Sequence, residues 1–284
     1  MRLILGRASK QVKVRAMVDT DPLRVFLQGI LQSNEGRLSG VQSNLDNGEL
    51  KGVALTASNY STGQSITWVQ ANEVDHWQRA HRKSISANVN VKHIMASAAL
   101  PLFFPAVEVD GEWYGDGGIR LTAPLSPAIH LGAKKILAIS TRYVPTIEEQ
   151  GAGMIDDYPP PAQVVGAIFN AIFLDVFDND ALRLERINTL IEYSTEEHDH
   201  KLEPVKLLLL RPSENLGKIA NQFEPNLPRI FRFMTRGLGT KEPRANDLLS
   251  MVMFQQDYIS AMMDLGFRDA ESRLDELNSF FNDD

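Results

Sequence analysis

Two short apolar runs with the character of buried strands constrain the fold of this chain most strongly. They are residues 135–140 (KILAIS) and 206–212 (KLLLLRP). The first follows a short helical pattern over residues 124–133 that Gly132 ends, and a long helical pattern over residues 163–193 lies between the two runs. A helix, a glycine and a buried strand in this order are typical of an α/β unit with a covered sheet. The sequence therefore predicts an α/β fold with a mostly parallel sheet.

The composition excludes several classes of function. The chain has 284 residues, a formal net charge of -7 and no cysteine. Nucleic-acid binding requires a basic excess, so we expect no nucleic-acid partner. Without cysteine the chain has no disulfide, thiol nucleophile or thiolate metal ligand, which fits a reducing compartment.

No segment has the pattern of a targeting or membrane-spanning sequence. The N-terminal apolar run is shorter than the roughly 7–15 residues of a secretory signal. No stretch approaches the roughly 18 uninterrupted apolar residues of a membrane span. We expect a cytoplasmic protein, and peripheral contact with a membrane stays open.

The remaining elements follow from local patterns. A helix is predicted after Thr20 or Asp21 as N-cap, and a second over residues 90–100 that Pro101 stops. Two hairpins are predicted, with turns at residues 61–63 and at Asp110-Gly111, a type I′ pair. The C-terminal part is predicted to be helical, with one helix closed by Gly266 and a last helix that runs to about Phe281.

The beginning of the chain lacks a feature of this fold class. An α/β domain normally opens with a strand, whereas residues 1–18 are basic and aperiodic. We therefore expect the chain to begin within a fold.

Asp116, with Gly117 and Gly118 after it, is the strongest candidate for chemistry. It ends the second predicted hairpin, and ligands of α/β sheets gather where strands end. An ionised aspartate can accept a proton, and glycines can adopt positive φ and leave room for a reacting group. On these three residues alone, a plain Asp-Gly-Gly turn is the alternative.

The surrounding sequence resembles the distal half of the patatin-like phospholipase domain. The features that carry the resemblance follow one another in the family's order: Ala96-Ser97, Leu100-Pro101, Phe104-Pro105, Val107, Asp116-Gly117-Gly118, Pro124 and Leu131-Gly132-Ala133. The likeness covers residues 52–141 and continues more loosely on both sides. A long ordered match of this kind is far more specific than a short motif.

The resemblance implies acyl ester hydrolysis by a Ser-Asp dyad, and the sequence has no motif for a cofactor or metal. Asp116 would be the proton acceptor, and the nucleophilic serine would lie in a Gly-x-Ser-x-Gly elbow. No Gly-x-Ser-x-Gly and no glycine-rich oxyanion loop occur in these 284 residues. We therefore expect an incomplete three-layer α/β/α domain over residues 1–145, with a remaining strand and a helical extension over residues 146–284.

Two functions follow from this reading. The chain is by family a lipid or carboxylic ester hydrolase that lacks the nucleophile and is inactive alone. The alternative is a non-enzymatic protein, derived from such a domain, that binds lipid or a protein partner. The oligomeric state and the acyl and head-group specificity do not follow from the sequence.

Other polar clusters have simpler interpretations. His198 and His200 have an alternating spacing suited to a metal, but a solvated charged loop is favoured. The predicted helix over residues 228–239 could rest on a membrane with its arginines, although a helix packed on the core is favoured. His130 is assigned to a structural or pocket-lining position. The remaining candidates are assigned to surface or turn positions: His76, His81, His93, Ser58, Ser61 and Ser65.

Overall fold

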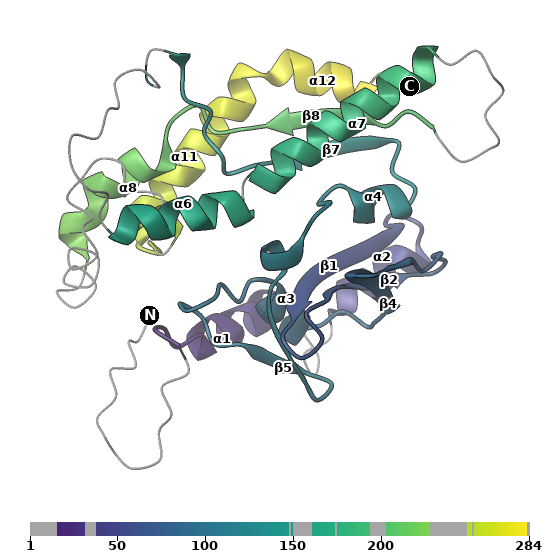
Figure 1. Cartoon of the computed structure of the whole chain (residues 1–284), viewed down its shortest axis with the longest axis horizontal. Coiled ribbons are helices and arrows are strands. Elements are labelled where there is room, and N and C mark those ends of the chain that lie inside the picture. Colours follow the sequence, from purple (N-terminus) through teal and green to yellow (C-terminus); the bar gives the residue numbers. More distant parts are fainter. Residues whose placement is uncertain are drawn as a thin grey trace. The chain divides into compact units, whose positions relative to one another are not determined.

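A computed structural model shows two compact units, residues 1–133 and 134–284 (Figure 1). The predicted division at residue 145 falls inside the second unit and stays a prediction. The structure describes residues 16–31, 38–147, 149, 161–173, 175–193, 203–227, 249–251 and 253–282.

The first unit is built on a six-stranded sheet in the order β3-β4-β2-β1-β6-β5. Its strands are β1 (Gly52–Asn59), β2 (Ser65–Ala71), β3 (Gln78–Arg79), β4 (Arg82–Ser86), β5 (Val107–Val109) and β6 (Glu112–Asp116). Only β2 and β4 pair in parallel; the other neighbours are antiparallel. The α/β class is confirmed, but a mostly parallel arrangement is wrong for this sheet.

Two tight turns explain the antiparallel pairing. Strands joined by a short hairpin must run in opposite directions. The predicted hairpin at Asp110-Gly111 is confirmed: both residues have positive φ, 52° and 83°, as a type I′ turn requires. The other hairpin joins β1 to β2 in the register Ser58–Ser65. Strand β6 then pairs with the end of β1, which places Asp116 opposite Ala57.

The core of the first unit lies between this sheet and helix α3 (Val91–Ser97). Its fully buried members include Ala57, Trp68 and Ala96, and Tyr114 packs edge-on against Trp68 at 4.8 Å. Asn90 caps α3, because its side chain accepts hydrogen bonds from the N–H groups of Lys92 and His93. Burial of these side chains fixes α3 against the strand that carries the site.

Shorter elements surround the sheet. They are α1 (Asp21–Ile30), α2 (Ser39–Asp46), the 3₁₀ helix η1 (Gly117–Arg120) and α4 (Ser126–His130). Helix α1 begins after Thr20 as predicted, although the Thr20 side chain makes no capping bond. Asp19 instead accepts a hydrogen bond from the N–H of Asp21 at 3.0 Å.

The second unit pairs the two apolar runs that the sequence indicated. Strands β7 (Lys135–Ile139) and β8 (Lys206–Leu210) are parallel neighbours. The helices are α6 (Pro161–Phe173), α7 (Asp175–Tyr193), α8 (Leu216–Phe223), the 3₁₀ helix η2 (Glu224–Asn226), α11 (Gln256–Ser272) and α12 (Leu274–Asn282). The prediction of three layers concerns the stacking of sheets and helices across the whole chain. It stays a prediction.

Helix α11 does not end at Gly266 as predicted. It continues to Ser272, and nothing lies within 4 Å of the position that a Cβ on Gly266 would take. The helix buries Tyr258 and Leu265 seven residues apart, so a continuous apolar stripe outweighs the weak helix propensity of one glycine.

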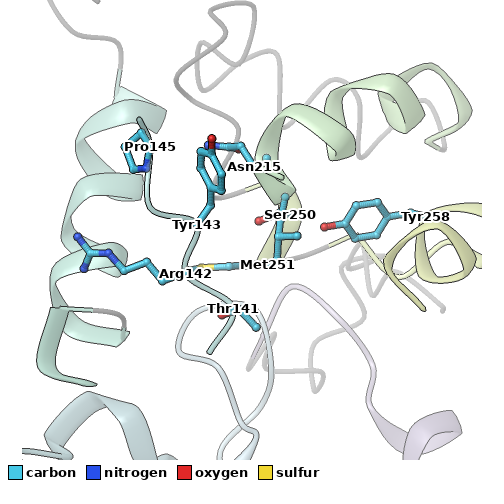
Figure 2. A pocket seen from close by; sticks show the side chains of 10 residues that line it. Thr141, Arg142, Tyr143, Pro145, Asn215, Ser250, Met251 and Tyr258 are labelled. Atoms are coloured by element: carbon cyan, nitrogen blue, oxygen red, sulfur yellow. The ribbon is translucent and has the colours of Figure 1, made fainter. Parts of the chain in front are cut away.

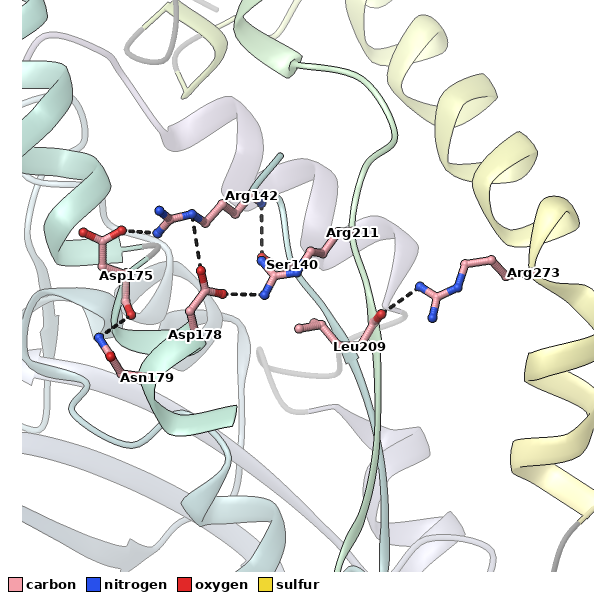
Figure 3. Close-up of polar contacts among 8 residues, drawn as sticks. All are labelled: Ser140, Arg142, Asp175, Asp178, Asn179, Leu209, Arg211 and Arg273. Carbon is pink, nitrogen blue, oxygen red and sulfur yellow. Dashed lines mark hydrogen bonds and ion pairs between the residues drawn. The ribbon is translucent and has the colours of Figure 1, made fainter. Parts of the chain in front are cut away.

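An ion-pair network joins the strand ends of the second unit to α7 (Figure 3). Arg142, just after β7, is paired with Asp175 and with Asp178, the latter at 3.3 Å. Arg211, just after β8, reaches the same Asp178 carboxylate at 2.6 Å. Arg273 donates to the carbonyl of Leu209 at 2.8 Å. One aspartate shared by two arginines thus links both strands to the first turn of α7.

His93 makes the stability of the first unit depend on pH. The side chain is 4% exposed, its ring lies 4.6 Å from that of Trp68, and its Nδ1 accepts a hydrogen bond from the N–H of Asn90. Burial is the main cause of a lowered pKa for His93. The unfolded chain therefore takes up this proton at a higher pH than the folded chain.

We expect the contribution of His93 to the free energy of unfolding to be present in full above about pH 6.5, the pKa of histidine in an unfolded chain. The free energy of unfolding should decrease as the pH falls below this value. Urea unfolding at a series of pH values measures this. His93→Gln serves as the matched control and should flatten the profile over that range. An identical slope in both proteins would show that His93 does not titrate on unfolding.

Candidate active site around Asp116

Asp116 is held at the end of β6 by backbone on both sides. Its N–H donates to the carbonyl of Ala99 at 3.0 Å, and its partner in the ladder is Ala57. Its carboxylate caps η1, with Oδ1 accepting a hydrogen bond from the N–H of Gly118 at 2.8 Å. The predicted position at a strand end is confirmed, and the aspartate is also a helix cap.

The Asp116 carboxylate is partly desolvated and only partly engaged. Among the described residues, the N–H of Gly118 is its one hydrogen-bond donor, which leaves Oδ2 available as an acceptor. Burial raises the pKa of Asp116, and the Gly118 hydrogen bond opposes this rise. A carboxylate with a raised pKa is a better proton acceptor at neutral pH than an ordinary one.

The two glycines after Asp116 serve close packing rather than unusual backbone angles. Neither Gly117 nor Gly118 uses the positive φ that glycine allows. A Cβ on Gly117 would lie 2.3 Å from the carbonyl oxygen of Thr56, which is closer than real contacts allow. Glycine is needed at position 117 because the chain enters η1 in direct contact with the backbone of β1.

The same Thr56 carbonyl is bound from a second direction. Ser97, at the end of α3, donates its hydroxyl hydrogen to this oxygen at 2.7 Å. Ala96 beside it is fully buried in the core. Thr56 therefore joins the Ala96-Ser97 motif to the Asp116-Gly117 motif, two sequence features that lie twenty residues apart. The sequence reasoning did not assign this role to Ser97.

Tyr60 is a further neighbour of the site that the sequence reasoning missed. A Cβ on Gly115 would lie 2.2 Å from the Tyr60 hydroxyl oxygen, so the tyrosine occupies the space beside this glycine. Burial raises the pKa of Tyr60, and the negative charge of Asp116 raises it further. The phenol therefore stays protonated within the field of the carboxylate.

A buried amide fixes the turn that carries Tyr60. The Asn59 side chain accepts hydrogen bonds from the N–H groups of Ser61 and Thr62, at 2.8 and 2.9 Å. Its Nδ2 donates to Glu112 at 2.7 Å, and the Tyr114 hydroxyl donates to the same carboxylate. Burial, followed by this bond, raises the pKa of Tyr114 to about 12. The sequence Asn-Tyr-Ser-Thr-Gly, residues 59–63, carries the signal for such a turn.

The serines near the first hairpin are not all turn residues. Ser58 and Ser65 are paired strand residues, each 3% exposed, so the turn interpretation is wrong for both. The Ser58 hydroxyl has no hydrogen-bond partner among the described residues. Ser58 pairs with Gly115, whereas Asp116 pairs with Ala57, and adjacent strand residues point to opposite faces of a sheet. The register does not bring the Ser58 hydroxyl to the Asp116 carboxylate.

The described histidines other than His81 take structural roles. His130 stacks on Trp77 with a ring distance of 4.3 Å, as a structural interpretation requires. His76 bonds through its two ring nitrogens to Ser84 and Ser86. The surface assignment of His93 is wrong, because this side chain is buried under Trp68.

Two predicted clusters fall outside the described residues. They are the pair His198 and His200 and the arginines of residues 228–239. Within the described part of the chain, no group of three histidine or acidic side chains could hold a metal ion. No described helix is long and apolar enough to cross a membrane.

The second unit contains a cavity of about 360 Å³ beyond the carboxyl ends of β7 and β8 (Figure 2). Thr141, Arg142 and Tyr143 line it after β7, and Asn215 lines it after β8. Figure 2 shows the hydroxyl of Tyr258 directed toward Ser250, and burial raises the pKa of this tyrosine to about 12. The Arg142 guanidinium is paired with Asp175 and Asp178 (Figure 3). Because these charged groups already have partners in the protein, they do not identify a ligand for the cavity.

The fold and the site of the first unit define a class. This is an α/β protein that presents a partly buried carboxylate at a strand end, followed at once by a glycine packed on the neighbouring strand. The family model of the patatin-like phospholipases matches residues 7–129, and this segment belongs to that family. The match includes Asp116 and supports the family assignment made from the sequence, which places the segment in a family of lipid hydrolases. No curated protein matches the chain.

Substitution of Gly117 tests the close approach to β1. We expect Gly117→Ala to lower the free energy of unfolding by about 1–3 kcal/mol, the usual cost of overpacking, because its Cβ meets a backbone oxygen that cannot turn away. Thermal unfolding measures this. Gly40→Ala in α2 is the matched control, since nothing lies within 4 Å of its Cβ position, and it should not destabilise the fold. Equal stability of both variants would contradict the packing role.

At neutral pH, the ionised side chain of Asp116 should lower the free energy of unfolding. Its folded pKa is raised, so its stabilising contribution is present below the unfolded value of about 3.9 and is lost as the pH rises through the folded pKa. We expect Asp116→Asn to be more stable than the parent at pH 7.5, with the gain disappearing under acid conditions.

Asp116→Ala is the matched control for the capping role. It leaves the N–H of Gly118 without its acceptor, so it should be about 1 kcal/mol less stable than the asparagine variant. Chemical denaturation of the three proteins separates the two effects. If Asp116→Asn were destabilising at pH 7.5, the carboxylate would be a structural cap rather than a strained functional group.

Proposed function

We propose that Asp116 is the general base of a serine acyl hydrolase that acts on lipid or other carboxylic esters. The observation that carries this proposal is the partly buried carboxylate with one hydrogen-bonded oxygen, one unengaged oxygen and a raised pKa, within the segment that matches the family. Asp116 is the site residue; Gly117 and Gly118 support it by packing and by hydrogen bonding.

The chemistry assigned to Asp116 is proton transfer. The carboxylate takes the hydroxyl proton of a serine as the serine oxygen bonds to the ester carbonyl carbon, and the carbonyl electron pair moves onto oxygen. When the carbonyl re-forms, the bond to the alcohol breaks and the proton passes to the leaving oxygen. The Gly118 N–H fixes Oδ1, so Oδ2 is the atom that accepts the proton.

The nucleophile of this reaction is not among the 284 residues. They contain no Gly-x-Ser-x-Gly. A hydrolase that loses its nucleophile keeps at most the modest rate that comes from oxyanion stabilisation and binding. We therefore propose that this chain by itself is catalytically inactive.

A second candidate is a non-enzymatic protein that binds lipid or a protein partner. The observation that favours it is the retention of a folded site whose base has no nucleophile in the same chain. The two candidates differ in one respect that can be measured, because only the hydrolase needs Asp116 to be ionisable.

Ester hydrolysis by the purified chain tests the inactivity. We expect no hydrolysis of 4-nitrophenyl butyrate above that of the Asp116→Asn variant, and no serine labelling by a fluorophosphonate. Turnover by the parent chain that Asp116→Asn abolishes would overturn the inactivity and support the base. Turnover that survives in Asp116→Asn would oppose the base assignment.

A fusion tests the base directly. A patatin segment that carries Gly-x-Ser-x-Gly, joined ahead of residue 1, supplies the nucleophile. Activity of that protein should fall by about 10²–10⁴-fold with Asp116→Asn, the usual contribution of a general base. The conservative asparagine keeps the η1 cap, so a loss of folding cannot account for the decrease. An active fusion that tolerates Asp116→Asn favours the non-enzymatic candidate for the parent chain.

A further inference from the structure

A row of aligned residues crosses the sheet of the first unit on one of its faces. Residues that pair directly in neighbouring strands have their side chains on the same face. The row runs from β6 through β1, β2 and β4 to β3, and its pairs are Gly115–Ser58, Ser58–Ser65, Ser65–Arg82 and Arg82–Arg79. One end of the row therefore lies next to the candidate active site, and the other end carries two arginines at the β3 edge of the sheet.

The two arginines at this edge oppose each other directly. Arg79 and Arg82 are ladder partners in the antiparallel pair of β3 and β4, a position in which two like charges repel each other. The Arg79 guanidinium donates to the carbonyl of Gln78 at 3.1 Å. No acidic side chain that the structure describes forms an ion pair with either arginine, including Glu73 and Asp75 in the preceding loop. In the described part of the chain, this cationic pair therefore has no counter-charge.

His130 of α4 adds a third basic group beside the two arginines. Trp77 continues the pairing of β3 with β4, since its carbonyl accepts a hydrogen bond from the N–H of Ser84 at 2.9 Å. The Trp77 indole is stacked on the His130 ring, with 4.3 Å between the centroids and 6° between the planes. Burial is the main cause of a lowered pKa for His130, and the charges of Arg82 and Arg79 lower it further. The imidazole thus lies within the electrostatic field of both guanidinium groups.

These three groups are open to a ligand from solvent. The side chains of Arg79 and His130 are exposed, and that of Arg82 is half-buried, whereas Trp77 is buried and forms an apolar wall beside them. A guanidinium group matches an oxyanion, because its planar array of N–H groups donates two parallel hydrogen bonds to it. An anion that carries two charges would also remove the repulsion between the arginines. Phosphate has both properties.

We propose that Arg79, Arg82 and His130 form a binding site for a phosphate group. The guanidinium groups donate hydrogen bonds to the phosphate oxygens, and the imidazole, held by its stacking on Trp77, donates another. The site is separate from the candidate active site, since Gly115 and Arg82 are three strand spacings apart, about 14 Å. Binding requires neither the nucleophile nor the ionised Asp116, so the inference does not rest on the proposed function.

Calorimetric titration of the full 284-residue chain with inorganic phosphate tests this site. We expect one equivalent to bind, and Arg82→Gln to weaken binding by about tenfold or more, the usual effect of losing a hydrogen bond between charged groups. Lys83→Gln is the matched control. It removes the same charge from the next residue of β4, whose side chain lies on the opposite face of the sheet, and it should leave binding unchanged.

Thermal unfolding gives a second readout of phosphate binding. Phosphate should raise the Tm of the parent and of Lys83→Gln by more than sodium chloride of equal ionic strength does, because it binds the folded chain. Arg82→Gln should respond alike to both salts. Without phosphate this variant should be at least as stable as the parent, since one of two opposed charges is gone. Loss of binding then cannot be attributed to loss of folding.

NMR titration of the histidine rings tests the part of His130. Bound phosphate should move the titration of this ring to higher pH, because a neighbouring negative charge favours the protonated imidazole. The signal is assigned by its absence from His130→Gln, and Arg82→Gln should abolish the shift. An unchanged His130 titration in the phosphate-bound parent would contradict the role given to this residue.

Vesicles identify the compound that carries the phosphate. If vesicles of phosphatidylcholine with phosphatidic acid bind the parent but not Arg82→Gln, and free phosphate does not bind, the ligand is a lipid head group. Binding of free phosphate without binding of vesicles indicates a soluble phosphorylated compound, and binding of both shows that the phosphate group alone is recognised.

Two results would overturn the proposal. They are a parent chain that binds neither phosphate nor these vesicles, and equal binding by Arg82→Gln and Lys83→Gln. Asp116→Asn should bind phosphate as the parent does, so a failure of this site stays separate from a failure of the base assignment.

Discussion

The backbone carbonyl of Thr56 is the point on which the candidate site depends. Ser97 binds it from α3, and Gly117 passes against it just after the last ladder pair, Ala57–Asp116. Any side chain at position 117 would push η1 away from β1. The N–H of Gly118 would then no longer meet the Asp116 carboxylate, so the packing on one carbonyl sets the orientation of this side chain.

Stability and function make opposite demands on Asp116. Burial raises its pKa, which means that the ionised form is held in the fold at a cost. A carboxylate used only to cap η1 would be more stable in a solvated position, as capping aspartates usually are. The electrostatic effect of the Asp116 charge is also seen at Tyr60, because this charge raises the pKa of Tyr60. A strained group that the fold nonetheless retains is typical of a functional site.

The two units carry different kinds of polar group. In the first, a single carboxylate is left partly unengaged at the end of β6. In the second, the charged side chains near the strand ends are matched: Asp178 serves both Arg142 and Arg211, and Lys218 pairs with Glu149 (Figure 3). The ion pairs of the second unit hold strands to a helix, whereas the free carboxylate oxygen of Asp116 can accept a proton. This difference is the reason why the proposed chemistry is placed in the first unit.

The sequence by itself determined the local elements, the two hairpins, the α/β class, the family and the position of Asp116 at a strand end, because periodicity, turn residues and motif order are encoded locally. Only the tertiary structure decided that Gly117 serves close packing, that Ser97 shares its partner, and that His93 and Ser58 are buried. It also decided the antiparallel pairing of the larger sheet and the continuation of α11 past Gly266. These depend on which distant segments meet, and contacts across twenty to forty residues leave no periodic trace in a single sequence.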